Sequence, residues 1–447
     1  MAVSPDLSFL LVIGLQNLVM LTLLSRTPRN SFLRWICLPS ILYFAYLEIL
    51  LTRLTSTSFD VKIRTGGHAF TFLIQFIDLL FITNVDLTTT IQPNRLQTAW
   101  RYLLTIRGIG TPWQLKQLPA YPRVLRTNPP PSRTQYAVRH LAIVVWQVLF
   151  LRLLAHPSLH PSQPFYDDGQ EFSYRLTQWP SRLVSTYILG VIPSYLFLDI
   201  LYRCGAMVAV GTGLQTMADW PPLFGNLADA WTLRGFWGKF WHQYLRWPFT
   251  TLSTFLTGQV LGLRRHSLLE RYLNTFLIFF LSMASHTVCE IVAGVEGGHR
   301  GNFLFFAAQV PAIMFEDAVR YVWGWWVMRR QQYVVAGQSL QWRMRTQKEE
   351  EEREEGKGVT AAAAAAAPSP PPRLWQRMLG ASWVITWIAF SWTWYYFPII
   401  RSMIKQEDRM VAPPPGAATD WDWRTSGLLG LVVGGAVLLR VVFRAEL

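Results

Sequence analysis

Apolar runs of about 20 residues, the length that a transmembrane helix needs, recur along this chain and constrain its fold more than any other feature. Hydrophobic residues make up 51% of the 447 residues, and charged residues make up only 15%. Soluble domains carry roughly 25% charged residues. The sequence therefore predicts an all-α polytopic membrane protein, a single transmembrane helical bundle of about eight to ten spans.

The apolar runs place the spans and also show where the bundle is interrupted. Residues 205–217 are expected to form a further helix or a re-entrant segment, and residues 249–263 an interfacial one. The charge run 348–355 and the alanine tract 361–367 indicate a low-complexity linker over 346–372, which separates a transmembrane core (1–345) from C-terminal helices (373–447) that complete the bundle. The expected spans are 7–24, 33–51, 68–83, 136–155, 183–201, 271–295, 302–328, 374–400 and 428–442.

The chain is basic, with a formal net charge of +14. Its Lys and Arg residues flank apolar segments, which is typical of loops beside membrane spans and argues against a nucleic-acid partner. The lipid bilayer and an anionic cosubstrate are the partners that this charge favours. The three cysteines, Cys37, Cys204 and Cys289, have no metal-ligand spacing and are expected to be buried small residues, so no metal site is predicted.

Residues 220–248 form the most aromatic and basic stretch of the chain. A helix over 236–247 would be amphipathic, and Pro248 would end it. Such a helix suits a membrane interface or a charged ligand. Its aromatic face would carry Phe236, Trp237, Phe240, Trp241, Tyr244 and Trp247, and its cationic face Lys239, His242, Gln243 and Arg246.

His286 is the one histidine in the middle of a long apolar run. Ionisable groups inside a membrane are costly, so they are functional candidates. Ser282 and Glu290 lie four residues before and after it and share its helical face. Glu290 would then hold one imidazole nitrogen and leave the other free as a base. The alternative is a neutral histidine bonded to a neighbouring helix.

Other polar groups are expected to have structural roles. Glu316 and Asp317 lie four and three residues before Arg320, so either carboxylate can neutralise this arginine inside the bundle, with pocket lining as the alternative for Glu316. Gln309 is embedded in the same apolar run. The R-G-I-G-T-P-W sequence at 107–113 indicates a turn against a membrane surface. The loop with Asp167, Asp168 and Glu171 is expected to be a solvated acidic turn.

These residues resemble a known family. The F-W-G-K-F-W-H-Q sequence at 236–243 is similar to the F-W-x-x-x-W-[HN] signature of the wax-synthase-like group of membrane-bound O-acyltransferases. The preceding P-P-L-F-G-N-L-A-D-A-W-T-L-R-G and the later pair Ser285-His286 also match the family pattern. The R-G-I-G-T-P-W sequence resembles fungal members that acetylate terpenoids and meroterpenoids. The resemblance covers residues 94–330, and it differs at His242, where many relatives carry Asn.

The resemblance implies an O-acetyltransferase that transfers acetyl from acetyl-CoA, a cosubstrate and not a bound cofactor, to a hydrophobic alcohol of secondary metabolism. His286 would deprotonate the alcohol, and His242 would stabilise the oxyanion or orient the thioester. Lys239 and Arg246 would contact the CoA phosphates, with Trp237 and Trp241 docking their helix against lipid or the bundle. Glu290, Ser282, Gln309 and Glu316 would orient groups or line the pocket.

Two other functions remain open from the sequence. One is a long-chain acyl-CoA:alcohol acyltransferase that makes wax or sterol esters. The other is a non-enzymatic transporter or scaffold, in which His286 and Glu290 would relay protons. The expected location is the endoplasmic reticulum or another endomembrane. The acceptor and the oligomeric state are not encoded in any pattern that we can interpret.

Overall fold

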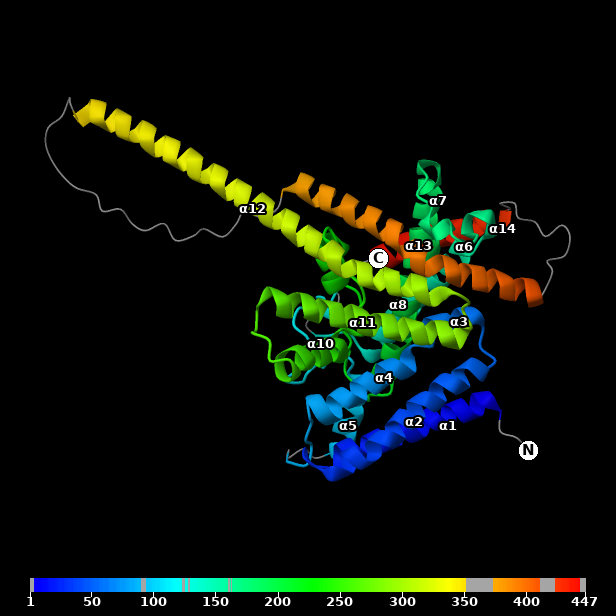
Figure 1. Ribbon diagram of the computed structural model, residues 1–447. Helices are drawn as coiled ribbons and strands as arrows, with labels where there is room; N and C mark the ends of the chain where they lie inside the picture. The colour runs from blue at the N-terminus through cyan, green and yellow to red at the C-terminus, as the bar shows by residue number, and fades with distance from the viewer. Residues whose placement is uncertain are drawn as a thin grey trace.

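The computed structural model describes residues 4–89, 94–122, 125–127, 129–159, 161, 163–350, 373–410 and 423–442. Within these ranges every regular element is a helix, which confirms the predicted all-α bundle (Figure 1). Apart from short 3-10 turns, the elements are α1 (Pro5–Arg26), α2 (Phe32–Leu54), α3 (Phe59–Thr65), α4 (His68–Ile77), η1 (Asp78–Ile82), α5 (Arg95–Leu104), α6 (Arg133–Leu154), α7 (Trp179–Leu183), η7 (Val184–Val191), α8 (Ile192–Gly211), α9 (Leu233–Gly235), η10 (Phe236–Phe240), α10 (Arg246–Phe255), η11 (Leu256–Val260), α11 (Leu268–Ala293), α12 (Gly298–Glu350), α13 (Leu374–Met410) and α14 (Trp423–Val442).

Six stretches of the described helices are long and apolar enough to cross a membrane: Pro5–Arg26, Phe32–Leu54, Phe59–Ile82, Arg133–Leu154, Leu176–Gly211 and Leu268–Ala293. The expected segments 183–201 and 205–217 are not separate: α8 continues from the first into the second and ends at Gly211, so residues 212–217 lie outside this helix. The apolar part of α14 is shorter, Thr425–Arg440. The linker expected from residue 346 begins later, since α12 is helical to Glu350; the remainder of that linker, 351–372, lies outside the described residues.

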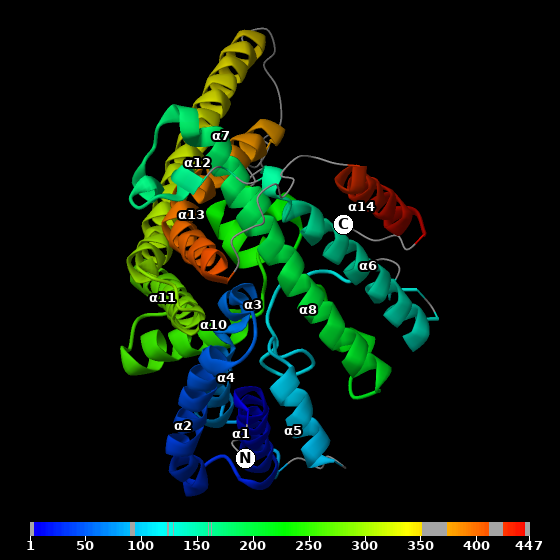
Figure 2. The same cartoon turned by 90° about the vertical axis from the view of Figure 1, so that its right-hand side faces the viewer.

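The N-terminal helices form a hairpin at one end of the molecule (blue in Figures 1 and 2). α1 and α2 pack on each other, α5 packs on α1, and α4 packs on α2. Arg34 is buried at the closed end and donates to the carbonyl oxygens of Thr27, Leu80 and Val85 at 2.9, 3.1 and 2.7 Å. Because these carbonyls lie where helical pairing ends, one guanidinium satisfies acceptors that would otherwise be orphaned.

Helices α11, α12 and α13 form a second group, in which α12 packs on both of its neighbours (Figure 1). Gly301 makes the α12–α13 contact possible. A Cβ at this position would lie 1.8 Å from the carbonyl oxygen of Trp394, so no side chain fits there. On the other side, α6 packs between α8 and α14 (Figure 2). Helices from both halves of the chain therefore take part in the bundle.

The R-G-I-G-T-P-W sequence does form a turn, but it packs against protein. Gly108 and Gly110 have φ angles of +62° and +72°, which glycine adopts without strain. Trp113 stacks on Trp247 of α10 with ring centroids 6.5 Å apart. Buried Arg107 donates to the carbonyl oxygens of Pro221 and Pro222 at 2.5 and 2.7 Å. The turn thus holds the start of the 220–248 stretch, and a membrane surface is not needed to explain it.

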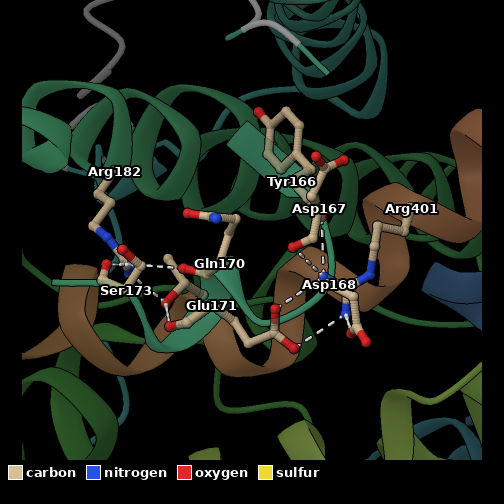
Figure 3. Close-up of polar contacts among 9 residues, drawn as sticks. Tyr166, Asp167, Asp168, Gln170, Glu171, Ser173, Arg182 and Arg401 are labelled. Atoms are coloured by element: carbon tan, nitrogen blue, oxygen red, sulfur yellow. Dashed lines mark hydrogen bonds and ion pairs between the residues drawn. The ribbon is translucent and has the colours of Figure 1, made fainter. Parts of the chain in front are cut away.

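The acidic loop is a docked segment and not a solvated turn (Figure 3). Glu171 is buried, and its two carboxylate oxygens accept from Arg401 of α13 at 2.9 and 3.1 Å. Arg182 donates to the carbonyl oxygen of Gln170 and to Thr393 Oγ1, at 2.6 and 2.9 Å. The expectation of a solvated turn was wrong for Glu171, because its partner lies 230 residues away in the sequence.

This docking predicts that two substitutions at the contact between the loop and α13 differ in their effect on the stability of the protein. Arg401→Met should destabilise the protein by about 2 kcal/mol, because it leaves the buried Glu171 carboxylate without its partner. Asp168→Asn is the control, since the Asp168 side chain is 97% exposed although it too lies near Arg401. Thermal unfolding of the detergent-solubilised protein measures both. Equal unfolding temperatures for the two variants would contradict the docked arrangement.

Candidate active site

A cavity of about 1630 Å³ lies among helices from both halves of the chain, and α11 forms its longest wall. The wall residues recur every three or four positions and so lie on one helical face. From Thr275 to Cys289 this face is roughly 21 Å long at ~1.5 Å per residue. The residues that α11 contributes to the wall are Thr275, Ile278, Phe279, Ser282, His286 and Cys289. The structure thus places His286 and Ser282 in the cavity, as the sequence predicts.

Two ion-paired arginines lie near the start of α11, and one of them, Arg234, lines the cavity. Asp317 of α12 accepts from Arg271 at the start of α11 and from Arg234, both at 2.8 Å. This shared carboxylate holds the segment around Arg234 near the start of α11. Lys239 and Arg246 also line the cavity. The pairing expected between Asp317 and Arg320 is not what the structure has, because Asp317 is bound to these two arginines from other elements.

α3 and the later turns of α13 line the cavity beside the later part of α11. α3 packs on the later part of α11, where a Cβ on Gly67 would lie 2.6 Å from Ser285 Oγ. Lys405 of α13 binds Glu296, just after α11, at 2.9 Å, so the last turns of α13 lie beside the end of α11. These two helices contribute mostly apolar side chains to the lining, with the ion-paired Asp60 and Arg64 among them. The lining residues from α3 and α13 here are Phe59, Asp60, Ile63, Arg64, Ile399, Ile400, Met403 and Ile404.

The helix expected over 236–247 is broken in the middle. η10 ends at Phe240, and Trp241 has extended backbone angles, φ −63° and ψ 156°. The chain there pairs with the preceding P-P-L-F-G segment: Gly225 N–H donates to Phe240 O at 2.9 Å, and Gln243 N–H donates to Leu223 O at 3.1 Å. These bonds replace the helical ones, so the predicted separation into two faces is lost.

Pro248 also has a different role from the one expected. It does not end a helix but lies in the first turn of α10, which begins at Arg246. Proline is tolerated there, because the first N–H groups of a helix have no intrahelical partner. Pro248 therefore favours the start of a second helix. Lys239, in η10, and His242, in the break between the two helices, both line the cavity.

His242 is a half-buried residue that lines the cavity. Within the described part of the chain, its Nδ1 has no hydrogen-bond partner. Its ring contacts Phe224 edge-on, with centroids 6.0 Å apart. Burial lowers the pKa of His242 to about 3, and the nearby His286 lowers it further as a second cause. His242 is therefore neutral at physiological pH and can either donate or accept one hydrogen bond in the cavity.

His286 has a partner that the sequence did not predict. Its Nδ1 lies 3.0 Å from the hydroxyl oxygen of Tyr395 of α13. Its ring stacks on Phe306 of α12 with centroids 5.0 Å apart. The three residues come from three helices, so the geometry depends on the tertiary packing. No spacing rule could have found Tyr395, which lies 109 residues after His286.

The predicted contact between Glu290 and His286 is absent. Glu290 is fully buried, and its Oε2 lies 2.8 Å from Nδ1 of His299 at the start of α12. The two side chains share a helical face, as expected, but the chain reverses after α11 and places His299 against Glu290. Glu290 therefore belongs to the α11–α12 junction, and it does not orient His286 by a hydrogen bond.

The predicted aromatic groups pack against the bundle and not against lipid. Trp237 Nε1 donates to Gln309 Oε1 at 3.2 Å, and Trp387 Nε1 donates to the same oxygen at 3.1 Å. Trp241 is buried in the core. Gln309 thereby holds the side chain of Trp237, which lines the cavity. The role predicted for Gln309 from the sequence is likewise to orient other groups or to line the pocket.

Glu316 and Arg246 stabilise the segment that carries the cavity residues. Glu316 Oε2 accepts from the backbone N–H of Leu233 at 2.6 Å, where α9 begins, and its predicted partner Arg320 instead lies over the ring of Trp231. Arg246 lines the cavity and donates to the carbonyl oxygen of Gly238 at 2.5 Å. One N–H group of Arg246 is thus used within the protein.

Comparison with known proteins agrees with this arrangement. Residues 220–308, which include both cavity histidines, match the model of the Membrane bound O-acyl transferase family. The chain is 30% identical to Acetyltransferase spyB of Aspergillus fumigatus, with 97% of this chain and 70% of the relative covered. It is 32% identical to Acetyltransferase pyr8 of the same organism, with 84% of this chain and 83% of the relative covered. It is 28% identical to Acetyltransferase TRI7 of Fusarium sporotrichioides, with 76% of this chain and 74% of the relative covered. No solved structure matches the chain.

A helical bundle with six stretches apolar enough to cross a membrane, and a cavity with two histidines, defines a membrane-embedded acyltransferase. The chain belongs to the membrane-bound O-acyltransferase family, together with the fungal acetyltransferases to which it is similar. The family resemblance deduced from the sequence is confirmed.

Proposed function

We propose that this protein transfers the acetyl group of acetyl-CoA to a hydroxyl group of a terpenoid or meroterpenoid alcohol. The observation that carries the proposal is the placement of His286 and His242 in one cavity that basic and apolar side chains line. The basic lining residues suit the phosphates of CoA, and the apolar ones suit a hydrophobic acceptor. The relatives named as acetyltransferases support acetyl as the group transferred.

In the proposed reaction, Nε2 of His286 takes the proton of the acceptor hydroxyl. The oxygen attacks the thioester carbonyl carbon, so a C–O bond forms and the carbonyl oxygen becomes an oxyanion. His242, a neutral residue that lines the same cavity, donates a hydrogen bond to that oxygen. The C–S bond then breaks, and the CoA thiolate takes the proton from His286. The proposed reaction forms no covalent intermediate with the enzyme.

Lys239 and Arg246 would hold the donor. Both line the cavity. Lys239 is a mobile point charge that can follow a phosphate, whereas the guanidinium of Arg246 is fixed by its bond to Gly238. A hydrophobic alcohol and a bilayer-embedded catalyst also fit an enzyme of the endoplasmic reticulum or another endomembrane. Ser282, one helical turn from His286, is positioned to contact either substrate.

The donor assignment predicts a separation of KM from kcat. Lys239→Ala should raise the KM for acetyl-CoA about five- to tenfold and change kcat less than twofold, because a phosphate contact made equally in the ground and transition states affects binding alone. Lys405→Ala is the control, since Lys405 pairs with Glu296 and is not one of the residues that line the cavity. Kinetics with farnesol, borneol and ergosterol as acceptors test this. An unchanged KM in Lys239→Ala would refute the phosphate contact.

The same assay compares acetyl-CoA with palmitoyl-CoA. We expect acetyl esters as the main products. Faster transfer of the palmitoyl group would overturn the acetyl assignment and leave acyl transfer itself standing.

A further inference from the structure

The partner of His286 is a neutral phenol held in a rigid aromatic setting. Tyr395 is 7% exposed, and its ring stacks on Phe305 and meets Trp392 edge-on, with both pairs of centroids 5.9 Å apart. Its hydroxyl oxygen lies 3.0 Å from His286 Nδ1. A side chain packed on several faces keeps its rotamer, so the hydroxyl has a fixed place relative to the imidazole.

This hydrogen bond determines which nitrogen of His286 can act. A neutral imidazole carries one N–H, and the other nitrogen holds a lone pair. If Nδ1–H donates to the phenol, Nε2 is bare and can accept the acceptor's proton. If the phenol donates to Nδ1, Nε2 carries the hydrogen and cannot act as a base. The two arrangements have the same heavy-atom distance but opposite chemical consequences.

In the part of the chain that the structure describes, no carboxylate takes this orienting position. Bases of this kind commonly have Nδ1–H held by a carboxylate or a carbonyl oxygen. Glu290, one turn along the same helix, binds His299 instead. Among the described residues, Tyr395 is the hydrogen-bond partner that the structure gives His286.

We propose that Tyr395 is a positioning residue for the proposed acetyl transfer: its hydroxyl oxygen accepts the Nδ1–H of His286 and so holds the tautomer whose bare Nε2 serves as the base. The inference rests on the proposed function, because it concerns the same base. Tyr395 does not exchange a proton with either substrate. It keeps the imidazole in one tautomer and one orientation, and it stabilises the imidazolium that forms during the reaction.

Tyr395→Phe tests this assignment, because it removes only the hydroxyl and keeps the ring contacts. We expect kcat to fall about ten- to hundredfold, the effect of losing one hydrogen bond that strengthens as charge develops, with the KM values of acetyl-CoA and the alcohol within about twofold. Tyr187→Phe is the matched control. Tyr187 donates to the carbonyl oxygen of Ile385, also in α13, at 2.9 Å, so this variant loses a bond to the same helix without touching His286.

The outcomes are distinct for the two proposals. A fall in kcat for Tyr395→Phe alone supports the positioning role. If Tyr395→Phe matches Tyr187→Phe, or if its kcat equals or exceeds that of the wild type, the phenol does not hold the catalytic tautomer and the inference is overturned. If His286→Gln remains fully active in the same assay, the proposed function fails as well. Loss of activity in His286→Gln with an unaffected Tyr395→Phe overturns only the positioning role.

Discussion

His286→Gln is expected to lower kcat for acetyl transfer about a thousandfold, because glutamine can still bond to Tyr395 but cannot accept a proton at the cavity side. General base catalysis contributes roughly 10² to 10⁴ in rate, and the remaining rate would come from binding the two substrates together. The KM for acetyl-CoA should change less than twofold. Steady-state kinetics of the purified protein measure both constants.

The control for this variant is another histidine that lies far from the chemistry. His266 is exposed in the connection before α11 and has a φ of +64°. Asparagine tolerates this backbone conformation, so His266→Asn should fold normally and keep the wild-type rate. If folded His286→Gln kept kcat within tenfold of the control, His286 would not be the base.

Gly225→Ala is expected to abolish activity, because the added methyl group would lie 2.0 Å from the carbonyl oxygen of Lys239. The clash is with backbone, so no side-chain rotation relieves it. The 225–240 backbone pairing that bends the chain before His242 would have to open. We expect at least a hundredfold loss in kcat/KM together with lower stability of several kcal/mol.

Gly258→Ala provides the comparison for this prediction. Gly258 lies in η11, and a Cβ there would have no heavy atom within 4 Å. Alanine also has the higher helix propensity, so this variant should be as stable as the wild type and as active. Activity assays and thermal unfolding of Gly225→Ala and Gly258→Ala measure the difference in kcat/KM and in stability between them. A fully active Gly225→Ala would show that the close backbone contact is not required for the site.

The sequence predicted the bundle and His286 because both depend on local patterns. Apolar runs of span length are readable one helix at a time. A histidine in the middle of such a run stands out by its cost in the membrane, whatever surrounds it. The Phe236–His242 motif was recognised in the same way, as a short string of residues.

The failures share a different physical cause. Helical periodicity over 236–247 predicted a continuous amphipathic helix, whereas the Gly225 segment competes for its backbone hydrogen bonds and breaks it after Phe240. Glu290 and Asp317 were paired with residues on their own helices, but both bind residues on neighbouring elements. Spacing along one helix shows which groups share a face. It does not show which other element packs against that face, so Tyr395 could not be found.

The most direct test of the account follows the acetyl group in a single turnover. Purified protein is mixed with [1-¹⁴C]acetyl-CoA, with and without an alcohol that it acetylates. Direct transfer predicts that free CoA and labelled ester appear together, only when the alcohol is present, and that His286→Gln forms both about a thousandfold more slowly. A burst of CoA without alcohol, or label covalently bound to the protein, would contradict the proposed single-step transfer by His286.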